Sequence, residues 1–308
     1  MLLYKYRSPI TDFSLKNSTC NTAKIFTENA LYYAKPSTLN DPYEAHVEFD
    51  FSACEEKAQI SHLRVLRERN RLNGNNMETL RQTWEQVQRN VKNQMEHIKN
   101  QTLDFHRYYR DGMDKNGILS LSEQRNNLLM WAHYASDHKG LCLGFNWDET
   151  GLPPSKEVAY LSTYRLVDIW AYTEDELVEI ACFQKSAEWS YEREWRSFSH
   201  ATYERYSELQ LTEKAKEEIT KAEAEGNDWL VKSIREAHTY GYRRPATVGH
   251  RALAFNKDAL KEVIFGGRMK QEDVKQHMKF IRSQGYAPQF YRTVRDQRRY
   301  ALTLTELS

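Results

Sequence analysis

Residues 118–145 read ILSLSEQRNNLLMWAHYASDHKGLCLGF and hold three patterns in direct succession. The run ILSLS (118–122) is typical of a strand, and LLMWAHYA (128–135) fits one or two helical turns. The run GLCLGF (140–145) has the continuous apolar character of a buried strand. Strands and helices mixed without a regular βαβ alternation predict an α+β fold.

The same patterns continue on both sides of this stretch. We expect further strands at 2–7, 30–34, 156–164, 194–198, 260–265, 289–294 and 299–304, and helical segments over 165–189, 212–238 and 273–282. Residues 55–111 differ, because they are rich in Arg, Glu, Gln and Asn and place apolar residues at steps of three and four. We therefore expect one α+β domain over residues 1–308, with a helical hairpin inserted at about 55–111 that serves as a structural prop or as a partner-binding arm.

Composition limits the class of protein. The 308 residues are 40% apolar and 28% charged, with only 12 Gly and 7 Pro, which excludes collagen-like, low-complexity and wholly disordered chains. No apolar run approaches the ~20 residues of a membrane helix. The four Cys are far apart and form no CxxC pair, so neither a disulfide framework nor a zinc ribbon is expected. A cytoplasmic protein without a membrane segment follows from these features.

The formal net charge of +1 conceals an asymmetry. Residues 148–228 hold 19 acidic and 9 basic residues, a balance of −10, whereas 229–308 hold 16 basic and 7 acidic residues, a balance of +9. The basic C-terminal segment 229–308 either meets nucleic acid or an acidic partner, or neutralises the acidic middle of the same fold.

The strongest local signal is WSYEREWR (189–196). On an extended chain Glu192 and Glu194 point to the same side, and two adjacent carboxylates repel each other. Such a pair suits a site where positive charge develops, such as an oxocarbenium ion, and the flanking aromatic rings would partly exclude water from it. The alternative is surface salt bridging with neighbouring arginines.

Two more motifs lie near the N-terminus. YKYR (4–7) alternates aromatic and basic residues, so that Lys5 or Arg7 could hold a phosphate while Tyr4 or Tyr6 contacts a ring. The segment YYAKPSTLNDPYE (32–44) gathers aromatics, hydroxyls and amides around a proline turn, which suits either a small-ligand pocket or a structural turn.

His133 and His138 in MWAHYASDHKG are five residues apart, and no third ligand stands at zinc-site spacing, so no metal is expected. The sequence also lacks a Walker loop, G-x-G-x-x-G, G-x-S-x-G and H-E-x-x-H. These absences argue against P-loop hydrolases, Rossmann oxidoreductases, α/β-hydrolases and zincins.

YKYR, NDPYE, MWAHY followed by HKGLCLGF, and K-x-x-x-W-x-YEREWR together resemble a bacterial family, the domain-of-unknown-function family twenty-nine seventy-one. A more distant similarity is to ADP-ribosyltransferases, whose three sequential elements are a basic residue ending the first strand, an aromatic and hydroxyl segment around nicotinamide, and a Glu opening a late strand. This resemblance implies a split β-sheet core and NAD as the substrate. It assigns catalysis to Glu194 and Glu192, and NAD binding to Tyr6, Arg7, Tyr33, Ser37, Asn40 and Tyr43, with the nicotinamide against either Tyr33 or Tyr43.

The function expected from these observations is NAD-dependent ADP-ribosyl transfer by a toxin or phage-defence effector. The acceptor is expected to be nucleic acid, either RNA or single-stranded DNA, rather than protein. It would be held by basic residues of the C-terminal segment, with Arg243, Arg244, Arg295 and Arg298 as the candidates. The effector class further implies an antitoxin or chaperone partner. The alternatives are a metal-independent nuclease that uses His133 or His138 with Glu194, and a binding module without catalysis.

Overall fold

The computed structural model describes residues 1–14, 18–50, 56, 58–60, 84–85, 87–89, 91–92, 102–163, 166–168, 172, 174–209, 211, 213–224, 231, 234–235 and 239–308. These residues form two compact units. The first unit comprises residues 1–199 and 250–308, and the second comprises residues 200–249.

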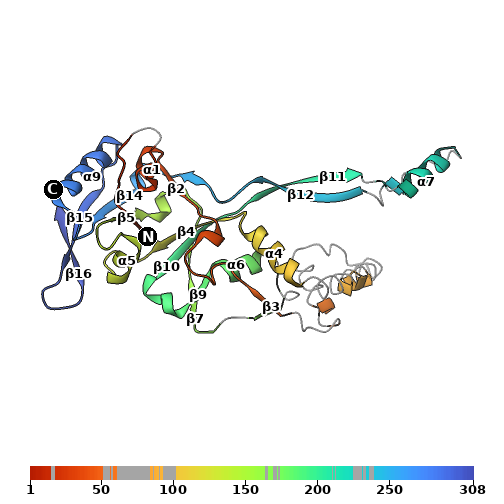
Figure 1. The fold of residues 1–308 in the computed structure, drawn as a ribbon, viewed down its shortest axis with the longest axis horizontal. Coiled ribbons are helices and arrows are strands. Elements are labelled where there is room, and N and C mark those ends of the chain that lie inside the picture. Colours follow the sequence, from red (N-terminus) through yellow and green to blue (C-terminus); the bar gives the residue numbers. More distant parts are fainter. Residues whose placement is uncertain are drawn as a thin grey trace. The chain divides into compact units, whose positions relative to one another are not determined.

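An eight-stranded sheet is the centre of the first unit (Figure 1). Its neighbours pair antiparallel except β14 and β15, which run parallel and are connected through helix α9 (Gln271–Ser283). The strands lie in the order β16 (Leu302–Leu307), β15 (Gln289–Arg295), β14 (Leu260–Phe265), β5 (Leu141–Asn146), β1 (Leu2–Arg7), β4 (Gly117–Ser122), β10 (Glu194–Ser199) and β6 (Ser155–Glu157).

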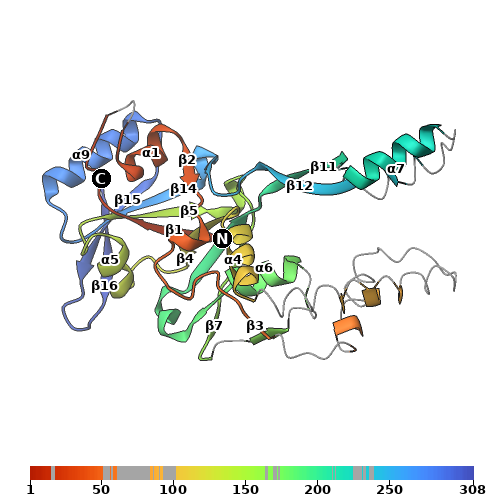
Figure 2. The ribbon, with the colours of Figure 1, turned by 45° about the vertical axis from the view of Figure 1, so that its right-hand side comes forward.

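Both faces of this sheet are covered, and strand alternation decides which side chain goes to which face. Leu141, Leu143 and Phe145 of β5 pack into the main core together with α9 and α1 (Asn21–Thr27). Cys142, which lies between them in sequence, packs on the opposite face with Trp131 of α5 (Leu128–Tyr134). Figure 2 shows α5 beside β1. Burial on both faces explains why the β5 sequence is continuously apolar.

The pairing between β1 and β4 is the weakest of the central ladder. β1 matches β5 over its whole length, from Leu2 opposite Asn146 to Arg7 opposite Leu141. Against β4 it forms one register pair, Tyr4 with Ser122. The sheet is therefore open between β1 and β4 beyond Tyr4.

Shorter elements surround the end of the sheet formed by β4, β10 and β6. β3 (Glu48–Asp50) pairs with β8 (Leu166–Asp168), β7 (Ala159–Leu161) with β9 (Gln184–Ser186), and β2 (Ala30–Tyr32) with β13 (Ala252–Ala254). A second apolar cluster joins β3, β8 and the sheet to helices α4 (Thr102–Met113) and α6 (Glu174–Cys182). Short 3-10 turns complete the unit at Pro36–Thr38, Trp147–Glu149, Ala187–Glu192 and Lys257–Ala259.

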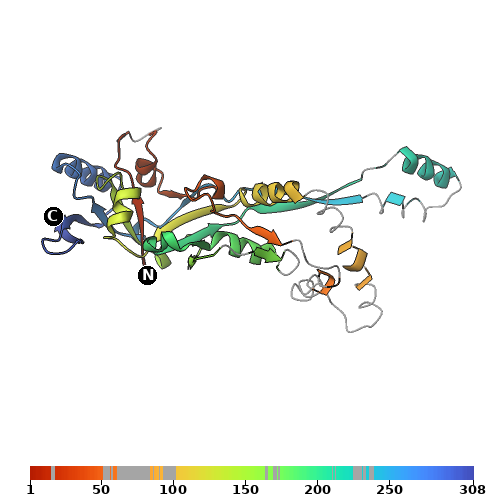
Figure 3. The same ribbon diagram turned by 60° about the horizontal axis from the view of Figure 1, so that its bottom comes forward.

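The second unit is a two-stranded antiparallel ribbon with a helix between its strands in the chain (Figure 3). β11 (Thr202–Leu209) pairs with β12 (Thr239–Thr247), and α7 (Glu213–Ala224) follows β11. Ile219 of α7 packs with Ile234, Leu211 and Val231, so the tip has its own small apolar cluster.

The α+β class is confirmed, and so are most of the expected strands. Residues 2–7 form β1 with the expected bounds, and the expected helix at 273–282 is α9. The continuous strand expected at 156–164 is divided into β6 and β7. Within the described part of the largely helical segment expected over 165–189, α6 lies between the short strands β8 and β9, and the 3-10 turn Ala187–Glu192 begins after β9. Most of the expected insertion at 55–111 lies outside the described residues, and its end forms α4.

Two further findings concern membrane-spanning helices and the state of the cysteines. None of the helices within the described ranges is long and apolar enough to cross a bilayer. Cys20, Cys142 and Cys182 are free thiols, and Cys54 lies outside the described residues.

A buried histidine links the N-terminal segment to α9. His277 accepts a hydrogen bond from the Ile10 backbone N–H at Nε2 (2.9 Å), while Nδ1 lies 2.6 Å from the Asp273 carbonyl oxygen. If Nε2 carried a proton, it would face the Ile10 N–H, which is also a donor. The imidazole ring of His277 is therefore neutral. Burial accordingly lowers the pKa of His277 below its ordinary value of 6.5.

We expect the free energy of unfolding to fall as the pH is lowered from about 7.5 to 5, because the unfolded chain takes up a proton that folded His277 resists. His277→Gln keeps an acceptor for the Ile10 N–H and should remove this pH-dependent component. His277→Ala should remove it too, and should cost about 1–3 kcal/mol near pH 7.5, because the Ile10 N–H loses its acceptor. Urea unfolding at several pH values measures the pH-dependent component and the cost of each substitution. The same pH slope in wild type and His277→Gln would contradict the assignment.

Candidate functional site

The opening between β1 and β4 leads into a cavity of about 150 Å³, called here the glutamate pocket. It is bounded by segments far apart in sequence, since β1, the turn after residue 38, β4, α5, β9 and the start of β10 all contribute to its wall. Its lining residues are Tyr4, Lys5, Tyr6, Leu39, Asn40, Glu44, Ser120, Leu121, Met130, Tyr134, Lys185, Glu192 and Glu194.

Arg193 has a left-handed backbone conformation, and this directs the carboxylates of Glu192 and Glu194 into the pocket. Glu192 ends the 3-10 turn Ala187–Glu192, Arg193 adopts φ 41° and ψ 59°, and Glu194 opens β10. The extended chain expected across this segment is therefore wrong, although both side chains do line one cavity. A non-glycine residue with positive φ costs on the order of 1 kcal/mol or more, which the surrounding contacts must offset.

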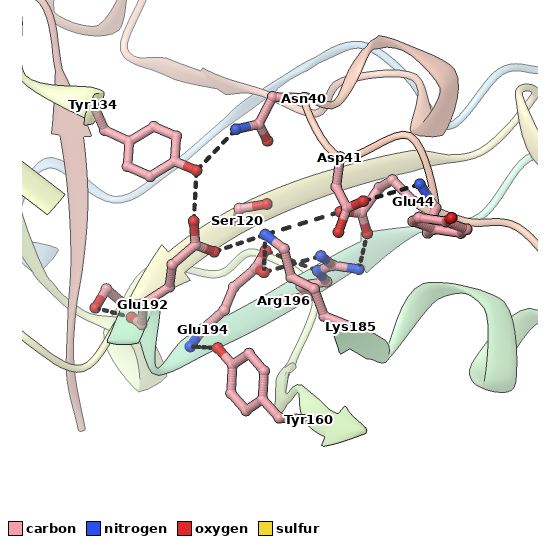
Figure 4. Close-up of polar contacts among 12 residues, drawn as sticks. Asn40, Asp41, Glu44, Ser120, Tyr134, Tyr160, Lys185, Glu192, Glu194 and Arg196 are labelled. Carbon is pink, nitrogen blue, oxygen red and sulfur yellow. Dashed lines mark hydrogen bonds and ion pairs between the residues drawn. The ribbon is translucent and has the colours of Figure 1, made fainter. Parts of the chain in front are cut away.

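Glu194 is held by two cations (Figure 4). Its Oε1 accepts from Arg196 Nε at 2.8 Å, and its Oε2 accepts from an Arg196 terminal nitrogen at 2.9 Å and from Lys185 Nζ at 3.3 Å. Burial alone would raise the pKa of this carboxyl, but the Arg196 guanidinium and then Lys185 outweigh it and lower the pKa to about 2. Glu194 is thus a fixed negative charge near neutral pH.

Glu192 has different partners. Tyr134 donates its hydroxyl to Oε1 at 2.5 Å, and Lys185 donates to Oε2 at 2.7 Å. Asn40 in turn donates its amide to the Tyr134 oxygen at 3.0 Å, which connects the proline turn to α5 (Figure 4). Both carboxylate oxygens of Glu192 therefore already accept a hydrogen bond.

α5 and the turn that carries Glu192 are fastened together by one amide. Asn127 accepts at Oδ1 from the N–H groups of Leu129 and Met130, which caps the helix. Its Nδ2 donates to the Tyr191 carbonyl oxygen at 2.9 Å. The helix bearing Tyr134 and the turn bearing Glu192 are thus held in fixed relation.

Glu44 completes a buried network of charges. It pairs with Arg196 and lies 4.0 Å from Lys185, and its side chain is 3% exposed. Burial raises the pKa of Glu44, and the charge of Arg196 opposes that rise. With all three carboxylates ionised, Glu44, Glu192 and Glu194 face two cations, so the cluster carries one net negative charge.

Lys5 enters the pocket from the other side of the opening. Its Nζ donates to the Ser120 carbonyl oxygen of β4 at 2.7 Å. Arg7 lies two residues further along β1, on the same face, and its buried Nε has no hydrogen-bond partner among the described residues. Burial and the neighbouring Arg7 charge lower the pKa of Lys5 to about 8, although Glu194 and Glu192 act in the opposite direction.

The pocket brings together four of the residues expected at the site, namely Glu192, Glu194, Tyr6 and Asn40. Tyr33 and Ser37 are placed elsewhere. Tyr33 is fully buried in the main core, with its hydroxyl 2.8 Å from Ser197 Oγ. Ser37 lies on an exposed turn and bonds Asp114 through its backbone N–H and its hydroxyl.

Tyr43 belongs to a second cavity of about 220 Å³ and is 62% exposed. Lys185 lines both cavities, so they lie on either side of its side chain. Neither Tyr33 nor Tyr43, the two candidates for nicotinamide stacking, lines the glutamate pocket. The aromatic walls there are Tyr4, Tyr6 and Tyr134.

Of the remaining candidates, Arg295, Arg298, His133 and His138 are not among the residues that line the pocket. Arg295 and Arg298 are exposed near the β15–β16 turn, whereas Arg243 and Arg244 belong to β12 of the second unit, with side chains outside the described set. His133 lies on α5, its ring centroid 6.2 Å from that of Tyr191, and His138 stacks on Trp131. Neither histidine lines the pocket.

Sequence reasoning did not assign a role to Glu44, Tyr134 or Lys185, and it named Arg196 only as a surface salt-bridge partner in the alternative interpretation, whereas the Arg196–Glu194 pair is buried. A signal for them was present, because Glu44 ends NDPYE, Tyr134 ends MWAHY, and Lys185 and Arg196 are the first and last residues of K-x-x-x-W-x-YEREWR. The family motifs thus supply most of the charged network.

Replacing Arg196 by Met should destabilise the fold by about 3–5 kcal/mol, since it leaves Glu44 and Glu194 buried without their principal cation. Glu194→Gln/Arg196→Met should recover part of this loss, and urea unfolding of the double-mutant cycle measures the coupling. A single Arg196→Met variant within about 1 kcal/mol of wild type would show that the network is not needed for stability.

Comparison with known proteins gives one match. The sequence model of the family described as "Protein of unknown function (DUF2971)" matches residues 130–197, from α5 to β10. No curated protein and no solved structure matches the chain. The matched segment carries Tyr134, Lys185, Glu192, Glu194 and Arg196, and so one wall of the glutamate pocket. The family that the sequence motifs resemble is therefore confirmed by the match over residues 130–197.

Proposed function

We propose that the glutamate pocket binds the nicotinamide end of NAD and that the protein is a cytoplasmic ADP-ribosyltransferase-like effector. The observation that carries this proposal is the convergence of two buried carboxylates, Glu192 and Glu194, on one cavity walled by tyrosines. The opening between β1 and β4 further supports a split-sheet core of the ADP-ribosyltransferase kind.

The size and walls of the pocket suit this ligand. A cavity of about 150 Å³ accepts a six-membered ring. A pyridinium ring is cationic, and the rings of Tyr4, Tyr6 and Tyr134 provide faces that attract a cation. In this proposal Arg7, which follows Lys5 on the same face of β1 but is not part of the pocket wall, is the cation that binds the diphosphate.

The charge of the pocket suits glycosyl transfer. As the bond between ribose C1′ and the nicotinamide nitrogen stretches, its electron pair moves to that nitrogen and the sugar becomes positive. When Lys5 is neutral, Glu44, Glu192 and Glu194 exceed Lys185 and Arg196 by one negative charge, and these groups are already held in place to stabilise this cation. Glu194 supplies a permanent charge, and Glu192 orients the acceptor.

The acceptor in this proposal is a single strand of RNA or DNA. Arg295 and Arg298 are exposed near the β15–β16 turn, where Tyr300 is fully exposed and can stack on a base. Arg243 and Arg244 are the further candidates on the second unit. A toxin or phage-defence effector of this kind needs a restraining partner such as an antitoxin or chaperone.

Glu192→Gln and Glu194→Gln should each lower NAD turnover by about 100–1,000-fold, because each removes a charge opposite the developing cation. Nicotinamide release measures the effect. Glu188→Gln is the matched control, since Glu188 is exposed on the same turn, and it should keep wild-type turnover.

Thermal unfolding of the Glu192→Gln and Glu194→Gln proteins shows whether they remain folded. Full turnover in either folded variant would remove that residue from the mechanism. Full biological function of a Glu192→Gln/Glu194→Gln protein that turns over no NAD would favour the binding module.

Binding of a short single-stranded RNA should weaken as salt is raised, because phosphate contacts release counterions. Arg295→Gln/Arg298→Gln should reduce the slope of log affinity against log salt by about 1 to 2. Lys275→Gln/Lys279→Gln on the exposed face of α9 is the charge-matched control. An affinity that stays flat from low to moderate salt would contradict a nucleic-acid acceptor.

A further inference from the structure

The Lys5 amine differs from every other charged group in the glutamate pocket. Lys185 and Arg196 each contact carboxylates, and Glu192 and Glu194 each contact cations. Lys5 Nζ makes a hydrogen bond to the Ser120 carbonyl oxygen, and no carboxylate of the described residues lies within ion-pair distance of it. One of the three N–H donors of the Lys5 ammonium group is therefore used by β4, on the far side of the opening. The other two remain for a ligand.

The surroundings of Lys5 favour loss of its proton. Arg7, on the same face of β1, is a like charge, and Lys5 and Arg7 are both partly buried. Glu192 and Glu194 face Lys5 across the cavity and favour the charged form, but their own charges are already held by Lys185 and Arg196. The balance leaves the pKa of Lys5 at about 8, close to the physiological range.

The other titratable groups of the pocket are poor proton acceptors. Glu194 has a pKa of about 2, and Glu192 already accepts a hydrogen bond at both oxygens. Burial raises the pKa of Glu44, but its carboxylate is engaged by the Arg196 guanidinium, and Lys185 is stabilised as a cation by its carboxylates. Tyr4, Tyr6 and Tyr134 all have a raised pKa because they are buried.

We infer that Lys5 is the catalytic base, which takes the proton from the acceptor as the acceptor attacks the ribose. This assignment rests on the proposed function. The acceptor X–H forms a bond from X to C1′ while the bond from C1′ to the nicotinamide nitrogen breaks with its electron pair. Nicotinamide leaves neutral, and the proton of X–H moves to the lone pair on Lys5 Nζ. Water removes that proton before the next turnover.

The charge state of Lys5 also governs the field in the pocket. With Lys5 protonated, three carboxylates face three cations, and the pocket is neutral. With Lys5 neutral, one net negative charge remains opposite the sugar. The form of the protein that can accept the proton is thus the form that best stabilises the cation.

The test is the pH profile of transfer to acceptor in three full-length proteins. Wild-type kcat should rise with pH around a midpoint of about 8. Lys5→Arg keeps the positive charge but cannot release its proton, so transfer should fall by about 100-fold or more and lose this pH dependence, while the Kd for NAD changes only a few-fold. Lys275→Arg, on an exposed face of α9, is the matched control and should behave as wild type.

A ligand-free measurement keeps the assignment falsifiable if arginine fits poorly at position 5. Acylation of wild-type lysines with acetic anhydride at graded pH, followed by peptide mass spectrometry, should give Lys5 a midpoint near 8, and the exposed Lys275 serves as the reference. A Lys5 midpoint equal to that of Lys275, or Lys5→Arg that transfers with an unchanged pH profile, would overturn the assignment alone. Absence of NAD turnover in the wild type at every pH would overturn the proposed function itself.

Discussion

The bidentate contact between Arg196 and Glu194 is the interaction on which the rest of the pocket depends. Arg196 is 1% exposed, yet it joins three separate segments, since it binds Glu194 on β10, Glu44 after the proline turn, and the Cys182 carbonyl oxygen at the end of α6. Carboxylates buried without a cation would cost several kcal/mol each. The guanidinium thus permits a polar cavity at a place where the sheet would otherwise be filled with apolar side chains.

The strands of the sheet could be predicted because their physical cause is local. Alternation fixes which face a side chain occupies, and the continuous apolar run of β5 follows from burial on both faces. The ribbon of β11 and β12 was not predicted. Its sequences, TYERYSEL and TYGYRRPAT, are rich in charge and lack an apolar face, and their pairing joins segments separated by some thirty residues. Pairing between segments so far apart in the sequence gives little local sequence pattern from which it could be predicted.

The site was predictable in part for a related reason. Adjacent carboxylates flanked by aromatic residues can be read from one segment, and Glu192 and Glu194 do share a pocket. The turn that directs them there depends on the left-handed conformation of Arg193, which no residue type at that position indicates. The counter-charges on Lys185 and Arg196 act through tertiary contacts. Tyr33 shows the converse, because a tyrosine that suits a ring pocket is used instead to fill the core.

The amide of Asn127 has a mechanical consequence. Its three hydrogen bonds to Leu129, Met130 and Tyr191 couple the start of α5 to the turn that ends at Glu192. Thermal breathing of the cavity therefore moves helix and turn as one body, and the tyrosine and carboxylate they carry keep their separation while the β1 edge shifts. The less tightly paired margin lies between β1 and β4, which share a single register pair, so a change in the width of the opening there would leave the acidic wall undisturbed.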